Sequence, residues 1–162
     1  MSTAKAFPYE TRLNILHRPL EIIDEKALAD SCDYRWFNQT LCKVNESVVR
    51  MGVVQGEYHW HKHDQDDEFF YVIEGRLAID LQVRTVELAP RQGFVVPKGV
   101  VHRTRAGERT VILMVENAGI ISDWRLKIGP YSFNAFDRSA QYRFIPAVRG
   151  RGERGRIEQA RG

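Results

Sequence analysis

The chain has 162 residues, 43% of them hydrophobic and 28% charged, and can form one globular domain with a substantial core. Its net charge of +3 arises in residues 149–162, which hold five arginines and two glutamates, so the preceding residues are neutral overall. This balance argues against a nucleic-acid-binding surface on the folded body. No signal peptide or membrane-spanning apolar run is visible, so we expect a cytoplasmic protein. Cys32 and Cys42 are too few for a disulfide framework and are expected as reduced thiols.

Residues 1–40 are expected to form an extension that packs on the domain after it. Asp24 is placed to cap a short helix over residues 25–29. The large apolar side chains of Trp36 and Phe37 are expected to pack on the outside of that domain or on a second subunit. They therefore suggest a homodimer.

Residues 41–118 have the pattern of an all-β domain. Short β-rich segments alternate with turn residues, and no helical periodicity interrupts them. Glu74-Gly75 predicts a tight hairpin turn, because glycine readily adopts a positive φ. An antiparallel jelly-roll sandwich or barrel is the predicted fold. Its predicted strands span residues 47–54, 57–63, 68–74, 76–82, 84–88, 93–97, 101–106 and 109–116.

Two histidines and a glutamate lie close together within GEYHWHKHDQDDEFFYVIEG, residues 56–75. His61 and His63 are two residues apart, so on a strand both side chains leave from the same face and can converge on one metal ion. Glu68 begins an apolar run, where an unpaired carboxylate is costly unless it protonates or finds a partner. A metal ion is such a partner.

A second stretch, residues 93–102, ends in another histidine. Pro97 and Gly99 predict a turn into a strand that starts near His102, which would bring an imidazole from a distant segment. The two stretches resemble the two motifs of the cupin superfamily over roughly residues 44–116. The resemblance implies a double-stranded β-helix, or jelly roll, with one metal ion inside. The matching positions are Gly56, His61, His63, Glu68 and Gly75 in the first motif and Gly93, Pro97, Gly99 and His102 in the second, and the implied ligands are His61, His63, Glu68 and His102.

Three imidazoles and one carboxylate would leave one or two open positions on a divalent ion, which is typical of catalytic metal sites. The donor set suits Fe(II), Mn(II), Ni(II), Co(II) or Zn(II), and Fe(II) is the first choice for an oxygenase. Two alternatives are open: the histidines are surface polar residues, or the metal only ties strands together.

Neighbouring residues share the strand faces of the predicted ligands. His59 is expected inside, either supporting the ligands or facing the substrate as an acid or base, and a rim histidine bonded to water is the alternative. Phe70, Val72 and Thr104 are expected to line the cavity, with plain core packing as the alternative. Such a lining suits a small, partly apolar organic molecule.

The pattern of strands loosens after Glu116. Residues 119–148 are expected to cover the domain, with a short helix or a coil over residues 133–144. Residues 149–162 hold one core-forming residue, Ile157, and are expected to be a disordered, solvated tail. Arginines without interleaved aromatic residues are a weak signal for RNA binding.

The resemblance implies a metal-dependent enzyme that acts on a small organic molecule, because cupins include dioxygenases, isomerases, polyketide cyclases, decarboxylases and lyases. An oxygenase is expected first, since two free neighbouring positions can hold substrate and dioxygen together. A redox-neutral isomerase, cyclase or lyase is one alternative. A non-catalytic binder or sensor is another, although the sequence has no helix-turn-helix segment that would favour a regulator.

Overall fold

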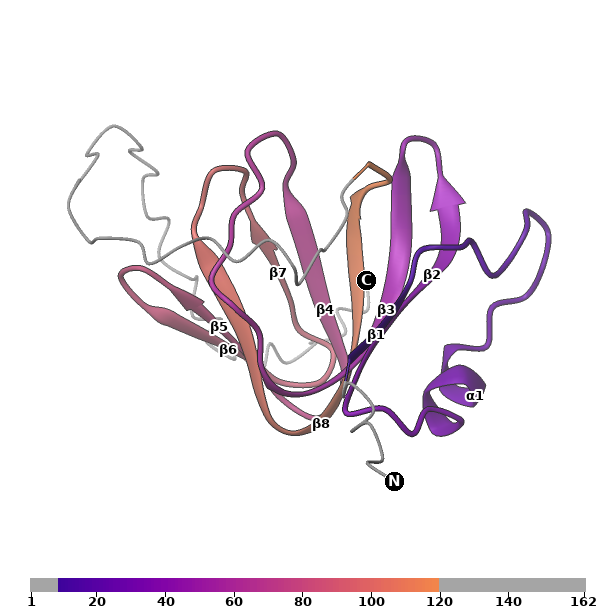
Figure 1. Ribbon diagram of the computed structural model, residues 1–162, viewed down its shortest axis with the longest axis horizontal. Helices are drawn as coiled ribbons and strands as arrows, with labels where there is room; N and C mark the ends of the chain where they lie inside the picture. Colours follow the sequence, from indigo (N-terminus) through magenta and orange to yellow (C-terminus); the bar gives the residue numbers. More distant parts are fainter. Residues whose placement is uncertain (1–8, 120–162) are drawn as a thin grey trace, which may run out of the picture. The chain divides into compact units, whose positions relative to one another are not determined.

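The computed structural model describes residues 9–119, which form eight strands and one short helix (Figure 1). The strands make a single sheet in the order β1-β2-β3-β8-β4-β7, with β5 joined to β8 and β6 joined to β5. The described part is therefore all-β, as predicted, and its only helix is too short to span a bilayer. The expectations for residues 120–148 and for the tail lie outside the described residues. The elements are β1 (Tyr9–Arg12), α1 (Glu25–Asp30), β2 (Trp36–Val44), β3 (Ser47–Glu57), β4 (Glu68–Glu74), β5 (Leu77–Leu81), β6 (Thr85–Leu88), β7 (Gly93–Val96) and β8 (His102–Asn117).

Strand β8 is the central strand of the sheet. It pairs antiparallel with β3 along most of its length, while its first part also pairs with β5 and its later part with β4. The prediction of two strands over residues 101–106 and 109–116 is wrong, because the intervening residues form an irregularity within one strand rather than a turn. There β8 places residues 107–109 opposite the single residue Gln55 of β3. An irregularity of this kind bends the sheet and lets the two parts of β8 serve different neighbours.

The predicted hairpin at Glu74-Gly75 is also wrong, although Gly75 does have a positive φ of 79°. Strands β4 and β5 do not pair with each other, because each pairs with its own part of β8. The backbone at Gly75 instead passes tightly over β8, where a Cβ would lie 2.5 Å from Oγ1 of Thr110. Thr110 Oγ1 also accepts a hydrogen bond from the backbone N–H of Arg76. Gly75 is therefore a crossing point between strands and not the tip of a hairpin.

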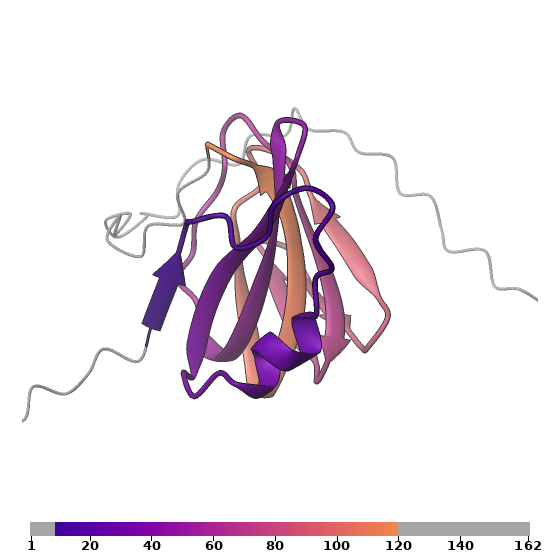
Figure 2. The same ribbon diagram turned by 90° about the vertical axis from the view of Figure 1, so that its right-hand side faces the viewer.

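The sheet buries apolar side chains on both faces. The inner face carries a cluster that includes Val54, Phe70 and Ile112. On the outer face, α1 packs against the sheet (Figure 2), and Ala29 of the helix belongs to a cluster there with residues of β2, β3 and β8. Asp24 caps α1 as predicted, accepting a 3.0 Å hydrogen bond from the backbone N–H of Ala27.

Strand β2 was not predicted, because its polar residues hide the β-pattern. Gln39 is buried, and its side-chain amide donates to the backbone carbonyls of Asn14 and Thr40. Phe37 packs on the outer face, as expected, whereas Trp36 belongs to the inner cluster, which corrects its predicted outside position. Both aromatic side chains are buried within the chain, at 3% and 5% exposure, so they offer no surface to a second subunit. The homodimer stays a prediction.

Ion pairs and hydrogen bonds link β5 and β6 to the start of β8. Asp80 accepts hydrogen bonds from Arg103, Arg105 and Thr85. These donors hold the pKa of the Asp80 carboxyl well below its ordinary value, with the Arg105 hydrogen bond as the largest cause. Arg103 also lies over the ring of Trp60, 5.1 Å from its centroid. The ion pairs fix the strand that begins with His102.

Candidate metal centre

The four predicted ligands come from three separate places in the fold. Glu68 is the first residue of β4 and His102 the first residue of β8. The predicted strand over residues 57–63 is wrong, because β3 ends at Glu57 and residues 58–67 form a loop. The loop is nevertheless held in place. His61 and His102 exchange two 2.9 Å backbone hydrogen bonds, and the carbonyl of His63 accepts one from the N–H of Gly99.

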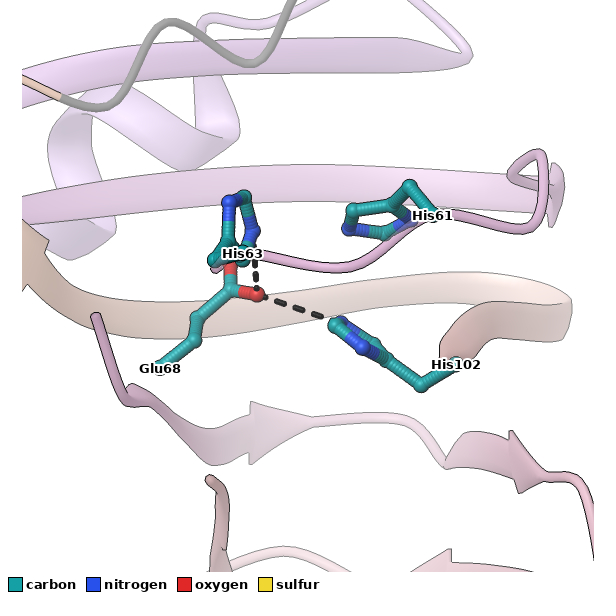
Figure 3. Close-up of side chains that lie close together, drawn as sticks. All are labelled: His61, His63, Glu68 and His102. Carbon is teal, nitrogen blue, oxygen red and sulfur yellow. Dashed lines mark hydrogen bonds and ion pairs between the residues drawn. The ribbon is translucent and has the colours of Figure 1, made fainter. Parts of the chain in front are cut away.

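The four side chains point toward one another (Figure 3). One nitrogen or oxygen from each of His61, His63, Glu68 and His102 lies within 4.8 Å of the others. Glu68 Oε2 lies 3.2 Å from Nε2 of His63 and 3.3 Å from Nε2 of His102. The structure therefore brings all four predicted ligands together, although the strand-parity argument for the first two histidines does not hold.

The ring nitrogens of two histidines are oriented by backbone carbonyls. Nδ1 of His61 lies 3.0 Å from the carbonyl oxygen of His59, and Nδ1 of His102 lies 3.0 Å from that of Val100. A carbonyl oxygen only accepts, so each Nδ1 must carry the proton and donate. In the neutral ring the lone pair is then on Nε2, the arrangement common in histidines that bind metals.

The electrostatics of the cluster favour the metal-binding protonation states of His61 and Glu68. Burial, followed by the neighbouring His102, lowers the pKa of His61 to about 4, so this imidazole is neutral at pH 7. Burial alone would raise the pKa of Glu68, but the hydrogen bond with His102 and the contact with His63 outweigh burial and lower it to about 2. The same contact with Glu68 raises the pKa of His63. A divalent ion could take the place of the proton that the contact with Glu68 favours on His63.

The residues present fit a divalent metal ion. His63 Nε2 is buried and has no partner with hydrogen-bond geometry among residues 9–119, despite its 3.2 Å contact with Glu68. A buried polar atom of this kind needs a partner. Three imidazoles and one carboxylate form a mixed nitrogen and oxygen donor set that suits transition metals.

His59 lies next to the cluster of four but does not belong to it. Its ring packs on that of Tyr58, with 4.1 Å between centroids, and lies 5.5 Å from the ring of His61. Its backbone carbonyl, rather than its side chain, orients His61.

Replacing His59 with alanine is expected to leave metal content within about twofold of the original, because alanine keeps the backbone carbonyl that orients His61. Ligand affinity or turnover is expected to fall about tenfold, since the ring lies beside the cluster. Elemental analysis and ligand titration measure the two effects. His61→Ala is the matched control, and equal loss of metal in both variants would place the His59 side chain among the ligands.

The centre opens into a cavity of about 30 Å³ between the inner faces of the strands. Of the predicted lining residues, Phe70 and Thr104 contribute to its wall, while Val72 is buried in the inner cluster and is not among the residues of the wall. Sequence reasoning missed the polar part of the lining. The missed polar residues are Asn38, Arg50 and Glu116, all of them buried.

Comparisons with known proteins agree with this architecture. The family model described as "Cupin domain" matches residues 48–116. The "Uncharacterized protein YdbB" of Bacillus subtilis is 42% identical over 92 residues, which cover 56% of this chain and 81% of that protein. The "Polyketide synthase CurC" of Streptomyces cyaneus is 44% identical over 45 residues, or 28% of this chain and 29% of that protein.

Solved structures show the same fold. A cupin-2 domain protein from Shewanella frigidimarina is 29% identical, with a TM-score of 0.57 over 59% of this chain and 94% of that one. Protein NMB1881 from Neisseria meningitidis is 23% identical, with a TM-score of 0.55 over 60% of this chain and 99% of that one, a likeness that concerns the fold alone. With the two motifs, the sheet and the four convergent side chains, these similarities establish that the chain belongs to the cupin superfamily.

Proposed function

We propose that the protein is a metal-dependent enzyme acting on a small organic molecule, and that its reaction is an oxygenation. The observation that carries the proposal is the convergence of His61, His63, Glu68 and His102, the first three of which line a small cavity. His61 and His102 are held by backbone hydrogen bonds in the orientation that presents Nε2. A redox-active ion such as Fe(II), bound by these four residues, would supply the activation of dioxygen.

The side chains around the centre suit a small, partly apolar substrate. Phe70, Ile112 and Met114 form an apolar part of the cavity wall and limit the access of water. The volume of about 30 Å³ has room for one or two water molecules, so a substrate must be small or must displace side chains. Thr104 and Tyr58 add hydroxyl groups that can orient a polar substituent.

A redox-neutral reaction is the second candidate function. The 45-residue similarity to a protein named polyketide synthase favours enols and diketones as trial substrates. An isomerase, cyclase or lyase could act on such compounds with a metal that has no redox chemistry.

Reconstitution with different metals distinguishes these functions. The apoprotein is loaded separately with Fe(II) or Zn(II) and offered small phenols, enols and diketones while oxygen and substrate are measured. Oxygen consumption coupled to substrate loss with Fe(II) alone is the expected result, because Zn(II) has no redox chemistry. Protein with His102 replaced by alanine, treated with Fe(II) in the same way, serves as the control.

Equal turnover with Zn(II) in the absence of oxygen would instead assign the protein to the redox-neutral class. Ligand binding without turnover by any metal would reject catalysis and identify a binder or sensor.

A further inference from the structure

A buried ion pair lies on the wall of the cavity that contains the candidate metal centre. Arg50 of β3 and Glu116 of β8 have side chains only 4% and 3% exposed, and Nε of Arg50 lies 2.7 Å from Oε1 of Glu116. Both residues line the same cavity as His61, His63 and Glu68. Burying two charges is expensive, and a well-packed apolar pair is often equally or more stabilising. Fold stability alone therefore does not account for this pair.

The sheet register places the pair next to the metal ligands. In the pairing of β4 with β8, Phe69 lies opposite Val115, and one further step along the same register brings Glu68 opposite Glu116. Glu116 is thus the cross-strand neighbour of a predicted metal ligand. Burial, followed by the charge of Glu68, raises the pKa of Glu116 to about 7, in keeping with this proximity.

The charges along the cavity wall leave an excess of positive charge when a divalent ion is bound. The charged lining residues other than the histidines are Arg50, Glu68 and Glu116, whose sum is one negative charge. A divalent ion changes that sum to one positive charge. A buried net charge is costly, so the loaded cavity favours a ligand that carries one negative charge.

We propose that the substrate is a small carboxylate monoanion and that Arg50, held in place by Glu116, binds its carboxylate group. This inference rests on the proposed function, because it requires the divalent ion. A guanidinium offers five N–H donors in a planar fork that matches a carboxylate, and it stays charged when buried. Glu116 positions the guanidinium from β8 and thereby directs it into the cavity. Phe70, Ile112 and Met114 line the cavity where the carbon skeleton would lie, and a divalent ion held by the four candidate ligands would bind the other end of the molecule.

A matched pair of probes tests the inference in the Zn(II)-loaded protein, in which no redox turnover competes with binding. Acetoacetate carries a carboxylate where 4-hydroxy-2-butanone carries a neutral hydroxymethyl group on the same carbon skeleton. Calorimetric titration is expected to show at least about tenfold tighter binding of acetoacetate, the range for a hydrogen bond to a charged group. Equal affinities, or no binding of acetoacetate, would overturn the inference while leaving the metal-dependent function standing.

A double substitution then assigns the preference to the ion pair. Arg50→Gln with Glu116→Gln removes both charges together, so that neither partner is left as an isolated buried charge. Zinc content should remain near one per chain while the preference for acetoacetate disappears. The control, Arg12→Gln with Glu10→Gln, alters an exposed arginine and glutamate pair and should change neither quantity.

Two results of this step would overturn the assignment. A preference that persists in the folded double variant would mean that the metal alone selects the carboxylate. A variant that loses its zinc would show that the pair supports the metal ligands instead. If the double variant does not fold, the single variant Arg50→Lys gives the same test, because it keeps the charge but loses the planar fork and should weaken the preference. Failure of the unaltered protein to bind zinc would reject both the proposed function and this inference.

Discussion

Replacing His102 with alanine is expected to weaken metal binding by more than about 100-fold. Residues that only support a metal ligand typically contribute 10- to 100-fold, and His102 would contribute a ligand nitrogen itself. Its Nε2 lies 3.3 Å from Glu68 Oε2, and its Nδ1 is fixed by the carbonyl of Val100. Removal of the ring would leave three donors and a hole at the start of β8.

Metal titration monitored by calorimetry measures this loss, with circular dichroism as the check on the fold. His17→Ala is the matched control, because His17 lies outside the cluster of four and near the exposed Glu21. His102→Ala is expected to keep its strand, since the backbone hydrogen bonds between residues 61 and 102 do not involve the ring. Unchanged metal affinity in a folded His102→Ala protein would reject the metal centre.

The cluster of four candidate ligands could be predicted from sequence because it depends on short motifs, whereas its surroundings depend on long-range pairing. His61 and His63 were predicted through strand parity, but they lie in a loop that β8 holds through the backbone of His102. The motif therefore named residues that the structure brings together, even though the local structure was different. No local signal shows that a loop will be fixed by a strand some forty residues away.

The inner face of the sheet was harder to predict, because strands that are apolar on both faces do not reveal which face is inside. Arg50 shares one face of β3 with Gly52 and Val54, and Glu116 shares one face of β8 with Met114. From sequence alone, a single charged residue in such a strand is predicted to face solvent. Only the pairing of β3 with β8 shows that the two opposite charges meet inside. The polar part of the cavity therefore required the tertiary structure.

The path of the chain at Gly75 also depends on a distant strand, and it leads to a strong prediction for stability. Gly75→Ala is expected to lower the free energy of unfolding by about 3 kcal/mol, through an unfavourable φ together with overpacking. The φ of Gly75 is 79°, and a Cβ there would lie 2.5 Å from Thr110 Oγ1 and 2.8 Å from the carbonyl oxygen of Arg109. One of these contacts is with backbone, which cannot move aside without disturbing the pairing of β8.

Alanine substitutions at two other glycines distinguish the effect of the positive φ from the effect of overpacking on stability. Gly99 has a φ of 78°, but a Cβ added there would have no atom within 4 Å, so Gly99→Ala should cost only the backbone term, about 1 kcal/mol. Gly107 has neither a positive φ nor a neighbour within 4 Å of an added Cβ, and Gly107→Ala should change stability little. Urea unfolding of the three variants should therefore give losses in the order Gly75, Gly99, Gly107. A Gly75→Ala loss no larger than that of Gly99→Ala would mean that β4 and β5 do not cross β8 as closely as described, and that the two parts of β8 can move apart to admit a methyl group.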